Sequence, residues 1–432
     1  MTPIRRALVW LVTFGGRILV LVLGVSIAGV LFESMPSNHI TIESGTKSGL
    51  FDEMALRLAK DLAPHGITVD IVNRADSKNI IEDVASTTSK VDAGFVSADI
   101  PTSYADEVSQ VGTVMFAPIY LIANKQSGIH LISEMAGHKI SLYPSGSAAW
   151  ATCDYILRSY GVDFKKQAVD FGNGQGIINQ VASGSSDAGC FIDVPSGSTM
   201  EYASKIQDDL ARKELTYLSI PQSLSVQARK DYLLPIEIPE GAFQVYPKVK
   251  PASNVATNAS IISFVAKSDL PQELATIIAH TLDREYRGST IANQAGTLPS
   301  TDYASVPAFQ VASDVYSNGL PWLYQALPYN LAAFLDRFVS RYGLLLTVLF
   351  LVLSILDSLG FRKPWEWVTT SRPKRMQIIV DEIEHRIGKG GHLTSRDKRR
   401  LAGIKRWVDQ ESEGIEKIGL RLQGIFARDS AN

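Results

Sequence analysis

The sequence has few of the residues on which catalytic and metal sites are commonly built. Its 432 residues include two cysteines, which are not in C-x-x-C spacing, and seven histidines, none of which forms an H-x-x-x-H pair. This pattern excludes zinc ribbons, thioredoxin-like redox sites and helical zinc-protease motifs. The chain also has neither a G-x-S-x-G nucleophile turn nor a Walker A sequence. We therefore expect no cofactor, no bound metal and no enzymatic activity.

The chain also has almost no net charge. A formal charge of −2 gives no reason to expect a nucleic acid partner. The charge is nevertheless distributed unevenly, because residues 1–17 carry three arginines and no acid. Residues 362–432 carry 16 basic against 10 acidic residues, which leaves −11 for the residues between the two basic ends.

Two long apolar runs explain this asymmetry. Residues 7–32 are interrupted only by Arg17 and are followed by no A-x-A cleavage site, which predicts an uncleaved transmembrane anchor within residues 1–35. Residues 342–361 predict a second transmembrane helix within 338–361, with Trp365 and Trp367 at the membrane interface. The alternative for each run is a buried helix of a soluble protein. With two spans, the positive-inside rule places both termini in the cytoplasm and residues 36–337 outside the cell (inner) membrane, in the periplasm or its equivalent.

The basic C-terminal segment, residues 362–432, predicts a cytoplasmic helical hairpin. Apolar residues recur at helical spacing on both sides of the glycine-rich "GKGGH" at 388–392. The hairpin either packs on itself or offers a docking surface to a membrane partner.

Between the apolar runs, short strand-like runs alternate with helical stretches, which predicts an α/β fold. Strands are expected within 39–45, 67–75, 93–99, 118–124, 138–146 and 187–194, and helices within 49–66, 76–89, 148–161, 174–184 and 268–286. Cys153 and Cys190 both lie in this outer segment, where a disulfide would persist. Their spacing leaves open whether they bond or are two small buried side chains.

Three strand-to-helix turns are rich in glycine, serine and threonine. They are "SGTKSG" at 44–49, "NRADSKN" at 73–79 and "YPSGSAAW" at 143–150. Each places small polar residues and free backbone amides at a helix start, where the helix dipole favours a carboxylate or phosphate. Arg74 adds a positive charge that suits a carboxylate. Ordinary helix capping accounts for any one turn, but three turns and an arginine favour an anion-binding cleft.

The motifs also follow a recognisable order. A Gly-Thr-x-x-Gly turn followed by an aromatic residue is matched by Gly45, Thr46, Gly49 and Phe51. After it come "SKNIIEDV", "VDAGFVSAD", "APIYLIA", "EMAGHKISLYPSGSA", "GSSDAGCFIDVPSG" and "IPEGAFQVYP". Over nearly the whole chain, this order resembles that of membrane-anchored TAXI-type solute-binding proteins of tripartite TRAP transporters.

The resemblance implies a bilobed type II periplasmic-binding-protein fold, with lobe 1 at about 39–125 and 235–310 and lobe 2 at about 126–230. It implies that a small organic acid or acidic amino acid is captured between the lobes and delivered to a transporter membrane subunit on another chain. The alternative is a ligand sensor or accessory membrane protein that reuses the fold and signals through the cytoplasmic tail. The expected ligand-binding residues are Gly45, Thr46, Ser48, Gly49, Phe51, Arg74, Ser77, Asn79, Tyr120, Ser145, Gly146, Ser147 and Asp193.

The chain departs from the family pattern in its binding turns. Asp52 stands where the resemblance expects a second aromatic residue, and Ser145-Gly146-Ser147-Ala148 replaces Gly-Ser-Gly-Thr. These departures predict a changed ligand, with Asp52 as the first residue to inspect.

Overall fold

The computed structural model describes residues 29, 35–74, 76–97, 100–170, 172–198, 200–303, 306–358, 379–385 and 394–408. These residues belong to two compact units, which lie within Met1–Arg341 and within Tyr342–Asn432. All the described strands lie in the first unit.

A ten-stranded mixed sheet forms the centre of the first unit. Its main path has the order β2-β1-β3-β10-β4-β7-β5-β6, with β8 paired to β4 and β9 to β10. The strands are β1 (His39–Ser44), β2 (Thr68–Asn73), β3 (Ala93–Val96), β4 (Val108–Asn124), β5 (Ile140–Leu142), β6 (Ala168–Asp170), β7 (Ala188–Ile192), β8 (Leu215–Tyr217), β9 (Leu233–Ile238) and β10 (Val255–Lys267).

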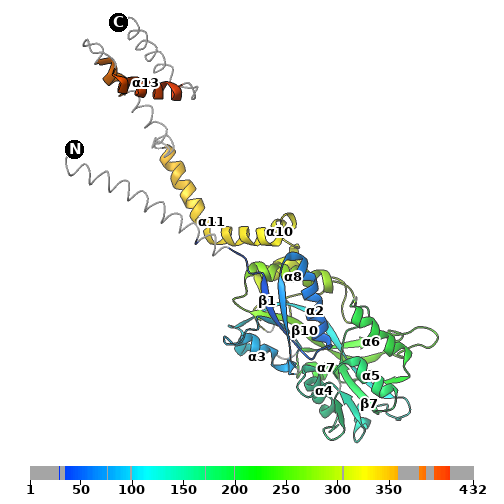
Figure 1. Cartoon of the computed structure of the whole chain (residues 1–432). Helices are drawn as coiled ribbons and strands as arrows, with labels where there is room; N and C mark the ends of the chain where they lie inside the picture. The colour runs from blue at the N-terminus through cyan, green and yellow to red at the C-terminus, as the bar shows by residue number, and fades with distance from the viewer. Residues whose placement is uncertain are drawn as a thin grey trace. The chain divides into compact units, whose positions relative to one another are not determined.

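Helices of the first unit lie around this sheet (Figure 1). The α-helices are α2 (Leu50–Leu62), α3 (Ile80–Ala85), α4 (Ala148–Ser159), α5 (Gly174–Ala182), α6 (Glu201–Arg212), α7 (Ser223–Gln227), α8 (Gln272–Tyr286), α9 (Gln310–Asn318), α10 (Trp322–Ala326), α11 (Tyr329–Ser358) and α13 (Ser395–Val408). Short 3-10 turns are η1 (Ala63–His65), η2 (Ser77–Asn79), η3 (Thr102–Tyr104) and η4 (Ile132–Met135).

The sheet has two halves that the long strand β4 connects. The first part of β4 pairs antiparallel with β10, and its last part, from Ile119 to Asn124, pairs antiparallel with β7 and β8. We call the half with β1–β3, α2, α3 and α8 the first lobe, and the half with β5–β8 and α4–α6 the second lobe. Within each lobe the neighbouring strands are mostly parallel, so their carboxyl ends form one edge. The α/β class expected from the sequence is confirmed.

Strand β10 is the main element that the sequence analysis missed. It lies in the middle of the sheet and pairs with β3, β4 and β9. Its interior contains buried polar residues, and two of them pair with other hydroxyl groups: Ser260 with Ser97 at 2.7 Å and Ser263 with Thr113 at 2.9 Å between hydroxyl oxygens. A strand with polar residues on both faces lacks the alternation that identifies a strand in sequence.

Helix α2 forms as its sequence predicts. Leu50, Met54, Leu58 and Leu62 recur at four-residue spacing and are all buried against the sheet. The chain then leaves the helix through a 3-10 turn that ends at Gly66, whose φ of +76° suits glycine. Because α2 begins one residue after Gly49, the strand-to-helix turn lies at the carboxyl edge of the sheet.

Cys153 and Cys190 form a disulfide, with their Cα atoms 6.0 Å apart. The bond joins the first half of α4 to the middle of β7. Both residues are buried. The disulfide therefore holds the start of α4 in place over the second lobe's strands.

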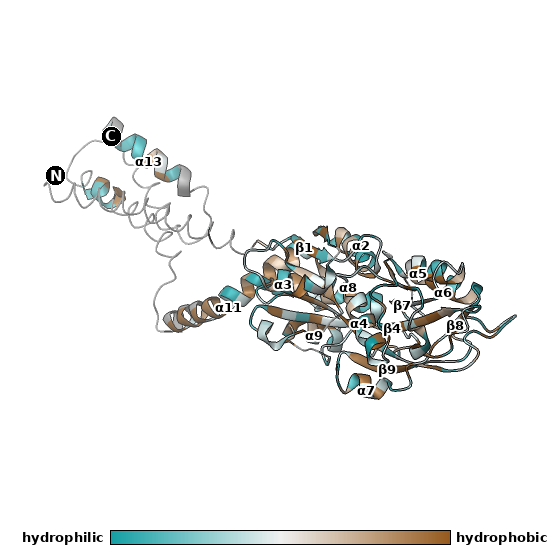
Figure 2. Ribbon diagram, turned by 90° about the horizontal axis from the view of Figure 1, so that it is seen from below, coloured by the Kyte–Doolittle hydropathy of each residue, from teal (hydrophilic) through white to brown (hydrophobic). Residues whose placement is uncertain are grey.

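Helix α11 contains most of the predicted second span, residues 338–361. Leu344, Phe350 and Leu351 are well exposed, and this part of the helix is coloured as hydrophobic in Figure 2. Even so, no helix within the described part of the chain is both long and apolar enough to cross a membrane. The second span is therefore not confirmed, and the first, residues 7–32, lies almost wholly outside the described residues.

The C-terminal tail is helical where it is described. Residues 379–385 and α13 fall within the two helices expected from the sequence. The glycine-rich connection expected at 388–392 lies outside the described residues.

Candidate ligand-binding site

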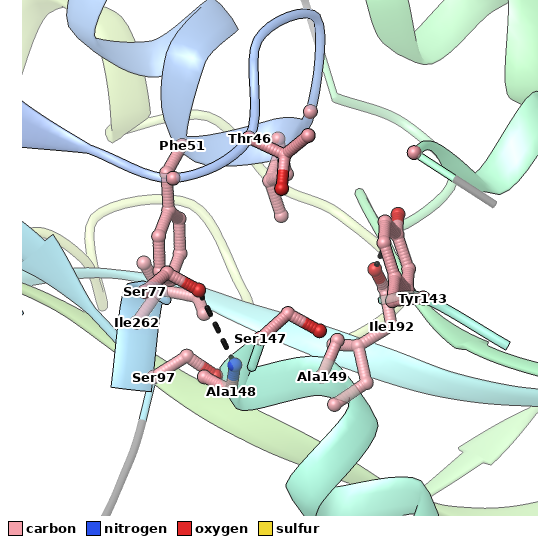
Figure 3. A pocket seen from close by; sticks show the side chains of 14 residues that line it. Thr46, Phe51, Ser77, Ser97, Tyr143, Ser147, Ala148, Ala149, Ile192 and Ile262 are labelled. Atoms are coloured by element: carbon pink, nitrogen blue, oxygen red, sulfur yellow. Dashed lines mark hydrogen bonds between the residues drawn. The ribbon is translucent and has the colours of Figure 1, made fainter. Parts of the chain in front are cut away.

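A cavity of about 470 Å³, including the part open to solvent, lies between the two lobes (Figure 3). It is formed where the carboxyl ends of β1, β3, β5, β6 and β7 approach one another, as expected for an open α/β sheet. The lining residues are Gly45, Thr46, Gly49, Leu50, Phe51, Ser77, Ser97, Tyr143, Ser147, Ala148, Ala149, Gly172, Ile192 and Ile262.

The turn before α2 supplies one wall of this cavity. Thr46 points into the cavity and faces Ser147 and Tyr143 of the second lobe (Figure 3). Gly49 is required by close packing, since a Cβ atom there would lie 2.9 Å from the carbonyl oxygen of Thr46. The Gly49 amide donates to that same oxygen at 2.9 Å. The turn is therefore tight, and it directs the Thr46 hydroxyl into the cavity.

Asp52 holds this turn from behind and does not line the cavity. Its carboxylate accepts hydrogen bonds from the Ser48 amide at 2.7 Å, from Asn73 Nδ2 at 2.5 Å and from the Ser44 hydroxyl at 3.4 Å. The side chain is buried. Ser48 has a positive φ of 61°, which is uncommon for a residue other than glycine, and the hydrogen bond to Asp52 supports it. The departure from the family pattern at Asp52 is thus explained by turn architecture.

The start of α4 supplies the facing wall. Ser147 caps the helix, because its hydroxyl oxygen accepts from the Trp150 amide at 3.1 Å. The Ala148 amide donates across the cavity to the hydroxyl oxygen of Ser77 in the first lobe, at 3.2 Å (Figure 3). The lobes are therefore in direct hydrogen-bonded contact beside the cavity. The Ala149 amide lies next in the same turn and has no hydrogen-bond partner within the described part of the chain.

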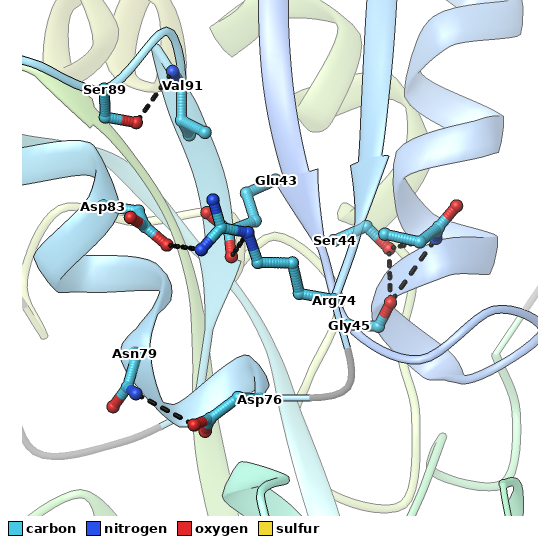
Figure 4. Close-up of polar contacts among 10 residues, drawn as sticks. Glu43, Ser44, Gly45, Arg74, Asp76, Asn79, Asp83, Ser89 and Val91 are labelled. Atoms are coloured by element: carbon cyan, nitrogen blue, oxygen red, sulfur yellow. Dashed lines mark hydrogen bonds and ion pairs between the residues drawn. The ribbon is translucent and has the colours of Figure 1, made fainter.

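Arg74 lies outside the cavity lining, in an ion-pair cluster of the first lobe (Figure 4). Its guanidinium contacts Asp83 at 2.7 Å and Glu43 at 3.5 Å. Burial, together with the nearby Asp83, raises the pKa of Glu43 to about 7, although Arg74 acts in the opposite direction. Arg74, which was expected in the binding site, is thus placed away from the cavity lining and is engaged by two carboxylates.

Other predicted residues also lie behind the lining. Asn79 donates to Asp76 at 3.0 Å, and the buried Tyr120 hydroxyl donates to the Val194 carbonyl oxygen at 3.0 Å. Burial raises the pKa of Tyr120 well above its usual value, so the phenol stays neutral. Six of the predicted residues line the cavity: Gly45, Thr46, Gly49, Phe51, Ser77 and Ser147. Seven do not: Ser48, Arg74, Asn79, Tyr120, Ser145, Gly146 and Asp193.

Asp193 is fully buried beneath the cavity wall. It accepts from the Tyr143 hydroxyl at 3.2 Å and from the Val194 amide at 2.8 Å. Its Oδ2 also lies against the first residue of α5, since a Cβ atom at Gly174 would lie 2.3 Å from it. A carboxylate at this helix start is favourable. Asp193 therefore positions Tyr143, which does line the cavity, and stabilises the start of α5.

Sequence reasoning missed the apolar part of the lining. Leu50, Ile192 and Ile262 join Phe51 on the cavity surface, and Ser97, Tyr143, Ala148, Ala149 and Gly172 complete it. Ser97 and Tyr143 directly follow strands and Ile192 ends one, so the rule that ligands bind at strand carboxyl ends would have found these three. Leu50, Ala148 and Ala149 are at helix starts, and Ile262 lies within the unrecognised β10.

Comparison with known proteins gives a match to one family model and to several solved structures. Residues 62–219 match the family described as NMT1/THI5 like. No curated protein matches the chain in sequence.

Several solved structures are similar to part of the chain. One is an ancestral arginine-binding protein bound to arginine, at 14% identity and a TM-score of 0.32, covering 59% of this chain and 95% of that one. Another is a substrate-binding protein of an ABC uptake transporter from Streptococcus pneumoniae with bound histidine, at 14% identity and a TM-score of 0.34, covering 61% and 96%. A third is a histidine kinase sensor domain similar to periplasmic binding proteins, at 12% identity and a TM-score of 0.33, covering 57% and 90%.

Proposed function

We propose that the chain is an extracytoplasmic solute receptor that binds a small organic acid between its two lobes, without chemical turnover. The observation that carries this proposal is the cavity itself, to which both lobes contribute hydrogen-bond donors. A site divided between two lobes favours capture by closure, because the ligand contacts both lobes only when they approach each other. We also propose that this receptor has the type II periplasmic-binding-protein fold and belongs to the TAXI-type solute-binding proteins.

We further propose that the receptor is anchored in the membrane and delivers its ligand to a TRAP-type transporter subunit on another chain. Two contacts support this arrangement. The Arg337 guanidinium donates to the Met35 carbonyl oxygen at 2.7 Å, and the Tyr329 hydroxyl donates to the Ser37 carbonyl oxygen at 2.8 Å. The chain segments that lead to the two apolar runs therefore lie side by side, as two anchors entering one bilayer would.

Ligand binding is tested by thermal unfolding of the full-length chain with small carboxylates and amino acids. A ligand that binds only the folded chain raises the unfolding midpoint as its concentration increases. We expect Thr46→Val to weaken that binding, since it removes a hydroxyl that points into the cavity at nearly constant volume. Thr102→Val, at an exposed position outside the cavity, is the matched control. The proposal fails if no acid or amino acid raises the midpoint.

Anchoring and delivery have separate tests. A reporter enzyme that functions only in the cytoplasm is expected to be active after Asn432 and inactive when inserted near residue 200. Uptake of the ligand is expected to survive deletion of residues 362–432. Loss of a cellular response to the ligand on that deletion, with ligand affinity retained, would favour a sensor in place of a transport receptor.

A further inference from the structure

The cavity is rich in uncharged hydrogen-bond donors. The backbone amides of Leu50 and Phe51, at the start of α2, have no hydrogen-bond partner among the described residues, and neither does the Ala149 amide at the start of α4. The Thr46 hydroxyl points inward (Figure 3) and likewise bonds to no residue that the structure describes. Two helix starts from opposite lobes therefore present amides to one small space, which is an arrangement that favours a negatively charged acceptor.

The same cavity has no charged side chain among its lining residues in the described part of the chain. Lys47 is exposed, and Arg74 is held by Glu43 and Asp83. An anionic group would therefore be held by amides and hydroxyls and by the helix dipoles, with no ion pair. A second anionic group on the ligand would be buried with no cation among the described lining residues, which is strongly unfavourable.

The two nearby carboxylates restrict the ligand further. Asp52 already occupies the start of α2, and Asp193 already occupies the start of α5. Helix α4 has no acidic residue in its first turn. The anionic group is therefore best placed beside Ala149, where the dipole of α4 is not offset by a carboxylate of the protein.

Apolar side chains form the rest of the surface. Leu50, Phe51, Ile192 and Ile262 line the cavity, together with the methyl groups of Ala148 and Ala149. Burying apolar ligand surface against them favours binding, because it removes that surface from water. An ammonium group placed there would lose its hydration and find no carboxylate among the lining residues that the structure describes.

We infer that the ligand is a monocarboxylate with an apolar body, whose acid group is held by uncharged donors beside Ala149 and whose body packs on Phe51, Ile192 and Ile262. This inference rests on the proposed function and narrows it. It favours an apolar organic acid over a dicarboxylate or an acidic amino acid.

The test compares four small solutes that differ in their charged groups, using calorimetric titration of the full-length chain. The solutes are 4-methylpentanoate, its uncharged amide, L-leucine, which adds an ammonium to the same skeleton, and pentanedioate, an unbranched five-carbon acid with two carboxylates. We expect 4-methylpentanoate to bind at least about tenfold more tightly than each of the others, since tenfold corresponds to 1.4 kcal/mol. Tighter binding of L-leucine, the amide or pentanedioate would overturn the inference and leave the proposed function standing.

A pair of variants tests where the acid group lies. Ala149→Asp and Ala149→Asn introduce side chains of nearly equal size at the same half-buried position. We expect Asp to weaken binding of 4-methylpentanoate at least about tenfold more than Asn, because it places a negative charge beside the proposed carboxylate. Equal effects of Asp and Asn would overturn this placement.

Failure of the inference differs from failure of the proposed function. If none of the four solutes binds but another small acid or amino acid raises the unfolding midpoint, the apolar monocarboxylate is wrong and the receptor function remains. If no small acid or amino acid binds at all, both are wrong.

Discussion

The sharpest structural prediction concerns Asp52, which the structure assigns to the architecture of the binding turn. In Asp52→Ala the Ser48 amide and Asn73 Nδ2 lose the acceptor that they contact at 2.7 and 2.5 Å. Ser48 and Asn73 are exposed, so water replaces part of each lost hydrogen bond, whose net contribution is about 0.5–1.5 kcal/mol. Loss of a negative charge at a helix start costs about 0.3–1 kcal/mol more. We therefore expect the free energy of unfolding to fall by about 1.5–4 kcal/mol.

Urea unfolding followed by tryptophan fluorescence measures this loss, and the same turn of α2 provides a matched control. Glu53 carries the same charge one residue later, but its carboxylate has no hydrogen-bond partner or ion pair with any described residue. Glu53→Ala removes only the interaction with the helix dipole, so we expect it to cost no more than about 1 kcal/mol. If Asp52→Ala cost as little as Glu53→Ala and instead changed ligand affinity alone, our assignment of Asp52 to the turn would be refuted.

Three further predictions test the surroundings of the site. Because the pKa of folded Glu43 is raised to about 7, the free energy of unfolding should fall between pH 4.5 and pH 7, by up to about 3 kcal/mol, and Glu43→Gln should flatten this dependence. Arg74→Ala should leave ligand affinity unchanged and destabilise the chain more at pH 8 than at pH 5, because ionised Glu43 then lacks its cation; a tenfold loss of affinity would contradict this. Replacing Cys153 and Cys190 by alanine should cost about 3–4 kcal/mol, since the disulfide closes a loop with a sequence separation of 37; an unchanged urea midpoint would contradict this.

Many helices and strands of the first unit were predictable because the sequence features that indicate them, glycines and the spacing of apolar residues, are local. Helix α2 begins and ends where its glycines and four-residue apolar spacing indicate, and β1, β2, β3, β5 and β7 fall within the expected runs. The failure at β10 has a physical cause. Its polar residues are buried and paired with β3 and β4, so its position in the sheet depends on partners more than 100 residues away.

The binding turns were predictable to the same extent. Thr46, Ser77 and Ser147 line the cavity because small polar residues after a strand are brought to the carboxyl edge of the sheet. The apolar part of the cavity lining could not be predicted from the sequence. Ile192 and Ile262 have the same apolar character as ordinary core residues, and only the tertiary structure places them on the cavity surface.

The sequence by itself determined the alternation of strands and helices, the tight glycine turns and the uneven charge of the chain, because each depends on residues close together along it. Only the tertiary structure decided which charges are engaged. Arg74 is held by Glu43 and Asp83, and Asp52 supports its own turn. Ionic and hydrogen-bonded partners are chosen by proximity in space and by burial. As a result, the described lining of the cavity offers uncharged hydrogen-bond donors, whereas the sequence had suggested that Arg74 would bind the carboxylate.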